Sequence, residues 1–226
     1  MYTITLNGNS SELSCNIFPP LEVDKTAQLC LLSLQTNNSI PNIEPVCYTI
    51  GFNNSFKITI PTGTYELSEL QSVIHKLLAQ KPIWLYIEAD SNTLKCKMSC
   101  NQAVDFTVEN NISRLLGFEN RIYEAGDHES GKIVNIMKVN CIKIACNLIS
   151  GSFSDGTPSQ TIHEFYPSVP PGYKIIEVPR HPVFYSINTT SISKVDLFLK
   201  DQDGSLINLR EQPITIRLQI KHSHGS

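Results

Sequence analysis

The chain has 226 residues, of which 41% are hydrophobic and only 17% are charged, and its formal net charge is −3. This length can bury one sizeable core, and the composition excludes an intrinsically disordered chain, which would be rich in charge and poor in aliphatic residues. The near-neutral charge excludes a broadly basic nucleic-acid clamp. The sequence has no run of 18 apolar residues, so no membrane span is expected. The first residues lack the features of a secretory signal.

Stretches rich in β-branched and aliphatic residues predict a mainly β protein. The expected strands are residues 2–6, 27–35, 56–60, 84–89, 93–98, 105–108, 133–147, 174–178, 194–200 and 214–221. Alternation is clearest at the end of this series, where Ile216, Leu218 and Ile220 share one face. Such a pattern is typical of a strand that is buried on one side only.

Turn residues separate these strands. Segments 18–21, 169–173 and 178–182 are rich in proline and are expected to be extended connectors, because proline cannot donate a ladder hydrogen bond. Asp203-Gly204 lies between two apolar runs, residues 195–199 and 206–209, and predicts a hairpin turn.

One convincing helix is expected over residues 68–79. Its apolar positions form a single stripe: Leu70, Val73, Ile74, Leu77 and Leu78. Ser68 and Gln71 have the spacing of a capping box, and Pro82 ends the helix. A second, short helix is expected at residues 111–117, ended by Gly117.

The order of these elements predicts a jelly-roll β-sandwich that carries an inserted small α+β unit. We assign the sandwich to residues 1–52 and 127–222, the inserted strand–helix–strand unit to residues 53–126, and a frayed polar tail to residues 223–226. Both junctions are polar and prone to turns, as domain boundaries usually are.

The seven cysteines do not predict a disulfide framework, because their number is odd and several lie in apolar, strand-like runs. We expect reduced core thiols in an intracellular compartment. Cys96 and Cys100 have a spacing found in some zinc sites, but the second pair of ligands that such a site needs is missing. No metal and no cofactor are therefore expected.

Signatures of catalysis are absent from the sequence, which contains no nucleophile elbow, phosphate loop, HExxH helix or dinucleotide-binding turn. His163 and Glu164 are adjacent, so in a strand they point to opposite faces. Lys95 and Lys97 have no aromatic neighbour on which a base could stack, so no nucleic-acid groove is evident. We expect that the chain has no catalytic residues and that the protein is not an enzyme.

Apolar and aromatic residues gather instead in the expected connectors, residues 17–21, 165–173 and 182–185. Such residues either pack onto the chain's own sandwich or form a subunit interface, whose centre is typically aromatic and poor in charge. For an interface, the candidates are Phe165, Tyr166, Tyr173, Phe184 and Tyr185, with Arg210 as a polar contact at the rim.

Several segments resemble jelly-roll capsid proteins of Polinton (Maverick) elements and the related adintoviruses. They are residues 15–23, 29–42, 60–67, 110–118, 169–176 and 201–210. The resemblance implies a capsid subunit of the virion, and the length suits the minor (penton) protein better than the major one. It also implies partners: a homo-oligomer, pentamer or trimer, with other capsid proteins, assembled in the host nucleus or cytoplasm.

Two other functions remain open from the residues alone. A receptor- or ligand-binding β-sandwich module would use loop residues such as Asp155, Gly156, Asp201 and Asp203. An enzyme of the cupin kind would need a His-x-His pair in the barrel, and the one such pair, His222 and His224, lies at the end of the chain.

Overall fold

The computed structural model describes residues 1–53, 56–137, 139–154 and 156–222, and the chain is mainly β. It divides into two compact units: a sandwich unit, Met1–Ile40 with Val139–Ser226, and an inserted unit, Pro41–Lys138. These boundaries differ from those expected at residues 53 and 126, because the strands at both junctions pair inside the inserted unit. The expected frayed tail lies outside the described residues.

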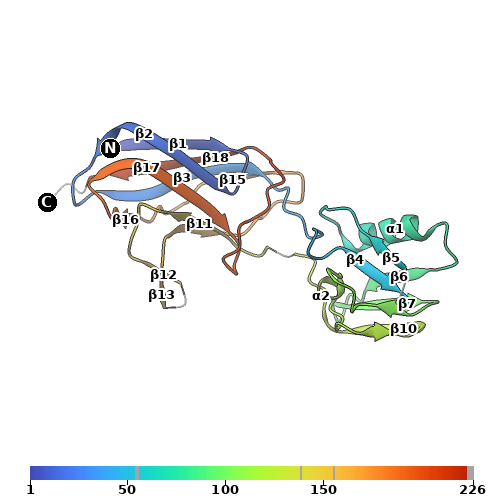
Figure 1. The fold of residues 1–226 in the computed structure, drawn as a ribbon. Helices are drawn as coiled ribbons and strands as arrows, with labels where there is room; N and C mark the ends of the chain where they lie inside the picture. Colours follow the sequence, from blue (N-terminus) through green and yellow to red (C-terminus); the bar gives the residue numbers. More distant parts are fainter. Residues whose placement is uncertain (54–55, 138, 155, 223–226) are drawn as a thin grey trace. The chain divides into compact units, whose positions relative to one another are not determined.

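Two antiparallel sheets make up the sandwich unit (Figure 1). One sheet has the order β1 (Tyr2–Gly8), β18 (Ile214–Lys221), β3 (Gln28–Asn37), β15 (Lys174–Glu177), with β16 (Tyr185–Ser186) also paired to β3. The other has the order β14 (Thr161–Phe165), β11 (Ile142–Cys146), β17 (Ser191–Lys200), β2 (Glu12–Glu22). A separate hairpin contains β12 (Ser152–Ser154) and β13 (Thr157–Ser159).

The strand pairing of the sandwich unit is nested. β1 pairs with β18, β2 with β17, β3 with β15, and β11 with β14, all antiparallel. A long antiparallel ribbon gives this pattern when it is rolled into two sheets, which is the jelly-roll topology of eight strands. The expected fold class, a jelly-roll β-sandwich, is thereby confirmed.

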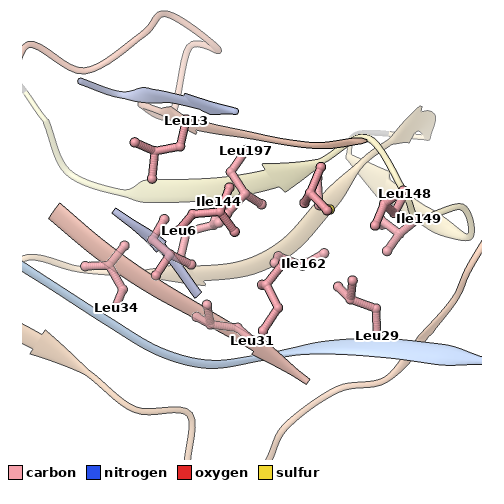
Figure 2. Close-up of a cluster of buried hydrophobic side chains, with 14 of the residues drawn as sticks. Leu6, Leu13, Leu29, Leu31, Leu34, Ile144, Leu148, Ile149, Ile162 and Leu197 are labelled. Atoms are coloured by element: carbon pink, nitrogen blue, oxygen red, sulfur yellow. The ribbon is translucent and has the colours of Figure 1, made fainter. Parts of the chain in front are cut away.

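The core of the sandwich unit lies between its two sheets. Figure 2 shows Leu31 of β3 and Leu6 of β1 pointing toward Ile144 of β11 and Leu197 of β17. All four side chains are buried. Ile216, Leu218 and Ile220 are also fully buried, as the alternation along β18 predicts.

Two expectations for this unit were wrong, and a third was met only in part. The segment with Phe18, expected to be a connector, is part of the long strand β2. The strand expected over residues 133–147 is only β11; of the residues before it, Ile136 packs on the core of the inserted unit and Val139 on that of the sandwich. The turn expected at Asp203-Gly204 does form, but a single antiparallel bridge, Lys200 with Leu206, stands in place of a second strand.

The inserted unit contains two further sheets and two helices. One sheet has the order β5 (Phe56–Thr59), β4 (Thr49–Phe52), β8 (Val104–Asp105), β9 (Ile122–Tyr123), and the other β10 (Gly126–Ile133), β7 (Lys95–Cys100), β6 (Leu85–Ala89). The helices are α1 (Leu67–Leu78) and α2 (Ser113–Leu116). β8 is shorter than the strand expected over residues 105–108. β10, a polar segment expected to be a boundary, is an edge strand, where charged side chains are typical.

Helix α1 lies where its apolar stripe predicts, and Leu70, Ile74 and Leu78 are buried. Its capping box is formed by Glu66 and Glu69, not by Ser68 and Gln71. Gln71 instead pairs with β6: its Nε2 donates to Leu85 O at 3.1 Å and its Oε1 accepts from Ile87 N–H at 2.7 Å. At 12 residues α1 is the longest helix in the described ranges. No helix in these ranges is long and apolar enough to cross a membrane.

The short helix α2 ends at Gly117, as expected, with a φ of +79°. A Cβ atom at this position would lie 2.2 Å from Lys132 O. Both the left-handed conformation and the close approach of the backbone therefore require glycine.

Candidate functional site

Three of the predicted interface residues lie at the end of the sandwich where β3 finishes. Tyr166 and Tyr173 begin and end the connector between β14 and β15, and they are 74% and 65% exposed. Asn38 holds this connector: its Nδ2 donates to Val169 O at 2.7 Å, and its backbone N–H donates to Tyr173 O at 2.8 Å. The turn with the exposed Arg210 is fixed nearby, because Ser39 Oγ donates to Leu209 O at 2.6 Å.

Phe184 and Tyr185 lie at the other end of β3. Tyr185 pairs with Leu29 and packs against the sandwich core, so it is only half-exposed. Phe184 is half-buried too, with Lys221 Nζ 3.5 Å from its ring centroid. The structure thus separates the predicted residues into two groups, one at each end of the sandwich.

Phe165 belongs to neither group. It pairs with Ile142 in the ladder of β11 and β14, and it is 7% exposed within the core. The alternative interpretation of the aromatic connectors, packing onto the chain's own sandwich, therefore describes this residue. We leave Phe165 out of the candidate contact surface.

His163 and Glu177 tie the two sheets together at one edge of the sandwich. His163 lies on β14 and Glu177 on β15, and His163 Nε2 is 2.9 Å from Glu177 Oε1. Adjacent Glu164 is exposed and does not share this contact, as the alternation of the strand requires. The His–Glu pair joins one sheet to the other, and the edge at which it lies contains β14 and β15.

The opposite edge contains β1 and β2, and here β2 forms a bulge. Leu21 pairs with Ile192 and Asn16 with Lys194, so residues 17–20 stand opposite Ser193 alone. Phe18 at its tip is 95% exposed. The apolar, proline-rich composition of residues 17–21 predicts an extended connector or an interface segment. It does not predict that the segment lies in a sheet.

A second surface that the sequence analysis did not identify lies on the inserted unit. Trp84 and Tyr86 are both exposed, and their ring centroids are 5.5 Å apart. Across the sheet, Tyr86 pairs with Ser99 and Ser99 with Asp127, and the Ser99 hydroxyl donates to the Asp127 carboxylate. The spacing of two aromatic residues at i and i+2 was the available sequence feature, because it places both rings on one face of a strand.

The residues considered for a ligand-binding loop are not brought together. Asp201 is buried, and its Oδ1 accepts the backbone N–H groups of Asp203 and Ser205 at 3.0 and 2.8 Å. Its carboxylate therefore holds the turn. Gly156 forms part of the turn between β12 and β13, and Asp155 lies outside the described residues.

Of the two histidines considered for a cupin-like site, the structure describes only the first. His222 contacts Asp24 through its Nδ1 atom, and His224 lies outside the described residues. Within the described ranges, no group of three His, Cys, Asp or Glu side chains could hold a metal ion.

All seven thiols are free, and burial suppresses their ionisation. Desolvation raises the pKa of Cys96 to about 12 and that of Cys146 to about 11. Cys100, four residues after Cys96 on β7, is also buried in the core of the inserted unit, and burial raises its pKa as well. A thiol is reactive as the thiolate, so these cysteines behave as small apolar residues.

Comparison with known proteins finds structural similarity without a match of sequence. No protein-family model matches the chain, and no curated protein matches it. Among solved structures, the crystal structure of the mavirus penton protein is similar, with a TM-score of 0.49 and 10% sequence identity. The match covers 98% of this chain and 100% of that one.

Proposed function

We propose that this chain is a structural subunit of a capsid, of the minor, penton type, belonging to a virus-like DNA element. The observation that carries the proposal is the nested strand pairing of the sandwich unit. The jelly roll that results is a fold used by viral capsid proteins. The sequence resemblance to capsid proteins of Polinton elements supports the same assignment.

The surface of the sandwich unit supports self-association as its mode of action. Exposed aromatic residues, among them Phe18, Tyr166 and Tyr173, stand on strands or on a connector that hydrogen bonds hold in place. Rigid aromatic side chains are common anchors of protein interfaces, because little conformational entropy is lost when they are buried. In this role the subunit works by contact with its own copies and with other capsid proteins in the virion.

The oligomeric state of the full chain tests this proposal. We expect a closed oligomer, a pentamer, in light scattering coupled to size-exclusion chromatography, and rings in negative-stain images. A chain that stays strictly monomeric at high protein concentration would contradict the proposed function.

A second candidate function, binding of a receptor or ligand, is favoured by the exposed Trp84–Tyr86 pair. An aromatic pair beside a hydroxyl and a carboxylate offers apolar faces and polar groups on one surface, as binding sites commonly do. A glycan array or a pull-down with the full chain, compared with its Trp84→Ser variant, tests this candidate. Saturable binding by the wild type that the variant loses would support it, and absence of binding in both would exclude it.

A further inference from the structure

We infer that the sandwich units of neighbouring copies join head to tail, with the Phe18 bulge of one copy against the β15 edge of the next. The β15 edge is defined here as Tyr173, Ile176, Val178 and Val183. This inference rests on the proposed function and names the surfaces by which a capsid subunit of this kind would assemble.

The bulge is a preformed apolar projection. Ile17 and Leu21 are half-buried against the sandwich core, so both of its ends are anchored. Pro19 and Pro20, between Phe18 and Leu21, have fixed φ angles and no N–H group. Phe18 is therefore held fully in solvent by residues that have little freedom to move, and burying it against another molecule costs little ordering entropy.

The β15 edge is an exposed apolar strip. β15 and β16 both pair with the side of β3 that faces away from β18, so the chain from Lys174 to Ser186 follows that one side. All four side chains of the strip are largely exposed; Ile176, near its centre, is 61% exposed. Ile176 lies beside the exposed Gln35 of β3. A strip of this kind on a sheet edge is a surface that proteins normally cover or use.

The exposed carboxylate directly beside the bulge and the exposed cations along the β15 edge are of opposite sign. Glu22 follows the bulge and is exposed, with Ser191 Oγ donating to its carboxylate; farther along the chain, Asp24 contacts His222 and Lys25 is exposed. Lys174 and Arg180 are exposed along the β15 edge, and within the described residues neither has a salt bridge. Lys194, next to the bulge, is already paired with Asp196 at 2.9 Å. The complementary charges favour a second copy of this chain as the partner.

The two surfaces stand on opposite edges of one sandwich. β1 and β2 form one edge, and β14 and β15, joined by His163 and Glu177, form the other. A contact between different surfaces of identical subunits is heterologous, and it generates a ring when the rotation closes. Each copy would then offer its bulge to one neighbour and its β15 edge to the other.

Two variants of the full chain remove one surface each. Phe18→Ser leaves the β15 edge intact, and Ile176→Asp leaves the bulge intact. We expect about a 30-fold or larger loss of association for each, the size that a central contact residue typically contributes. The matched controls are Phe153→Ser, an exposed phenylalanine on β12, and Ile122→Asp, an exposed isoleucine on the inserted unit. Both controls should assemble like the wild type.

Mixing the two variants gives the decisive measurement, because one intact interface remains between them. Native mass spectrometry with one variant isotopically labelled should show a one-to-one heterodimer that grows no further. Given rings of the wild type, three results would overturn the inference: unchanged assembly of Phe18→Ser, equal losses in the controls, or no heterodimer on mixing. Each of these results would leave the proposed function standing. A wild type that never assembles would contradict both.

Discussion

The sandwich unit and the inserted unit are built from the chain in opposite ways. In the sandwich unit the first strand pairs with the last, and β2 pairs with β17, so its sheets join segments from both ends of the chain. In the inserted unit every strand finds its partners within residues 41–138. The inserted unit therefore has its own core and its own strand partners, as an independently folding domain does.

Separate cores predict separate unfolding transitions, and Trp84 allows them to be distinguished. It is the single tryptophan of the chain and lies in the inserted unit, so its fluorescence reports on that unit. Far-UV circular dichroism reports on both units. Each of the changes below is expected to act on one unit alone.

The largest effect is expected for Leu218→Ala in the sandwich unit. Leu218 is fully buried on β18, between β1 and β3, so truncation leaves a cavity and lowers the free energy of unfolding by about 3 kcal/mol. In urea titrations, the circular dichroism transition of the sandwich should move to lower concentration while the tryptophan transition stays in place. Equal shifts of both transitions would show that the two units unfold as one.

A smaller effect in the other unit is expected for Asn42→Ala. Asn42 Nδ2 donates to Tyr65 O at 2.7 Å and to Ile136 O at 3.0 Å, and its Oδ1 accepts from Tyr65 N–H. Removing the amide leaves these backbone groups without their partner and should cost about 2 kcal/mol. This time the tryptophan transition should move. The reverse pattern would contradict the division of the chain at Pro41.

Thiol labelling offers a third measurement, one that changes no residue. Burial raises the pKa of Cys146 in the sandwich and of Cys96 in the inserted unit, so both should react slowly with a disulfide reagent in the native protein. As urea rises, each should become reactive at the transition of its own unit. Mass spectrometry of the labelled peptides distinguishes the two, and fast labelling of either cysteine without urea would contradict the structure.

The smallest effect is expected at low pH, from protonation of Asp90 in the inserted unit. A hydrogen bond from Lys97, at 2.7 Å, with those from the N–H groups of Thr93 and Asn92, lowers the pKa of the Asp90 carboxyl. Because the pKa is lower in the folded state, the stabilisation is present above the ordinary pKa of aspartate and is lost as the pH falls through the folded value. In a carboxyl NMR titration, Lys97→Ala should raise the pKa of Asp90. An unchanged titration would exclude the contact.

The sequence predicts an element correctly where all the apolar residues of its pattern pack on the same core. β18 and α1 each present one apolar face to one core, so period and burial agree. The expected strand over residues 133–147 was too long because Ile136 and Val139 serve different cores, and apolar spacing alone cannot reveal that. β10 was not predicted because an edge strand needs few apolar residues.

The candidate surface was predicted only in part, for the same reason. Aromatic residues in connectors can be buried or exposed, and the sequence does not say which. Phe165 faces the core because it lies opposite Ile142, whereas Tyr166, one residue later, faces solvent. The Phe18 bulge depends on a shift in pairing between β2 and β17, two strands far apart in the sequence, so no local pattern predicts it.

The position of the inserted unit between β3 and β11 also orders events during synthesis on the ribosome. Residues 41–138 emerge complete while β1 still awaits β18 and β2 awaits β17. We therefore expect the inserted unit to reach its native state first, with the three leading strands of the jelly roll unpaired until the carboxyl-terminal strands leave the exit tunnel. During that interval the nascent chain presents bare strand edges, which are prone to pair with other chains and aggregate.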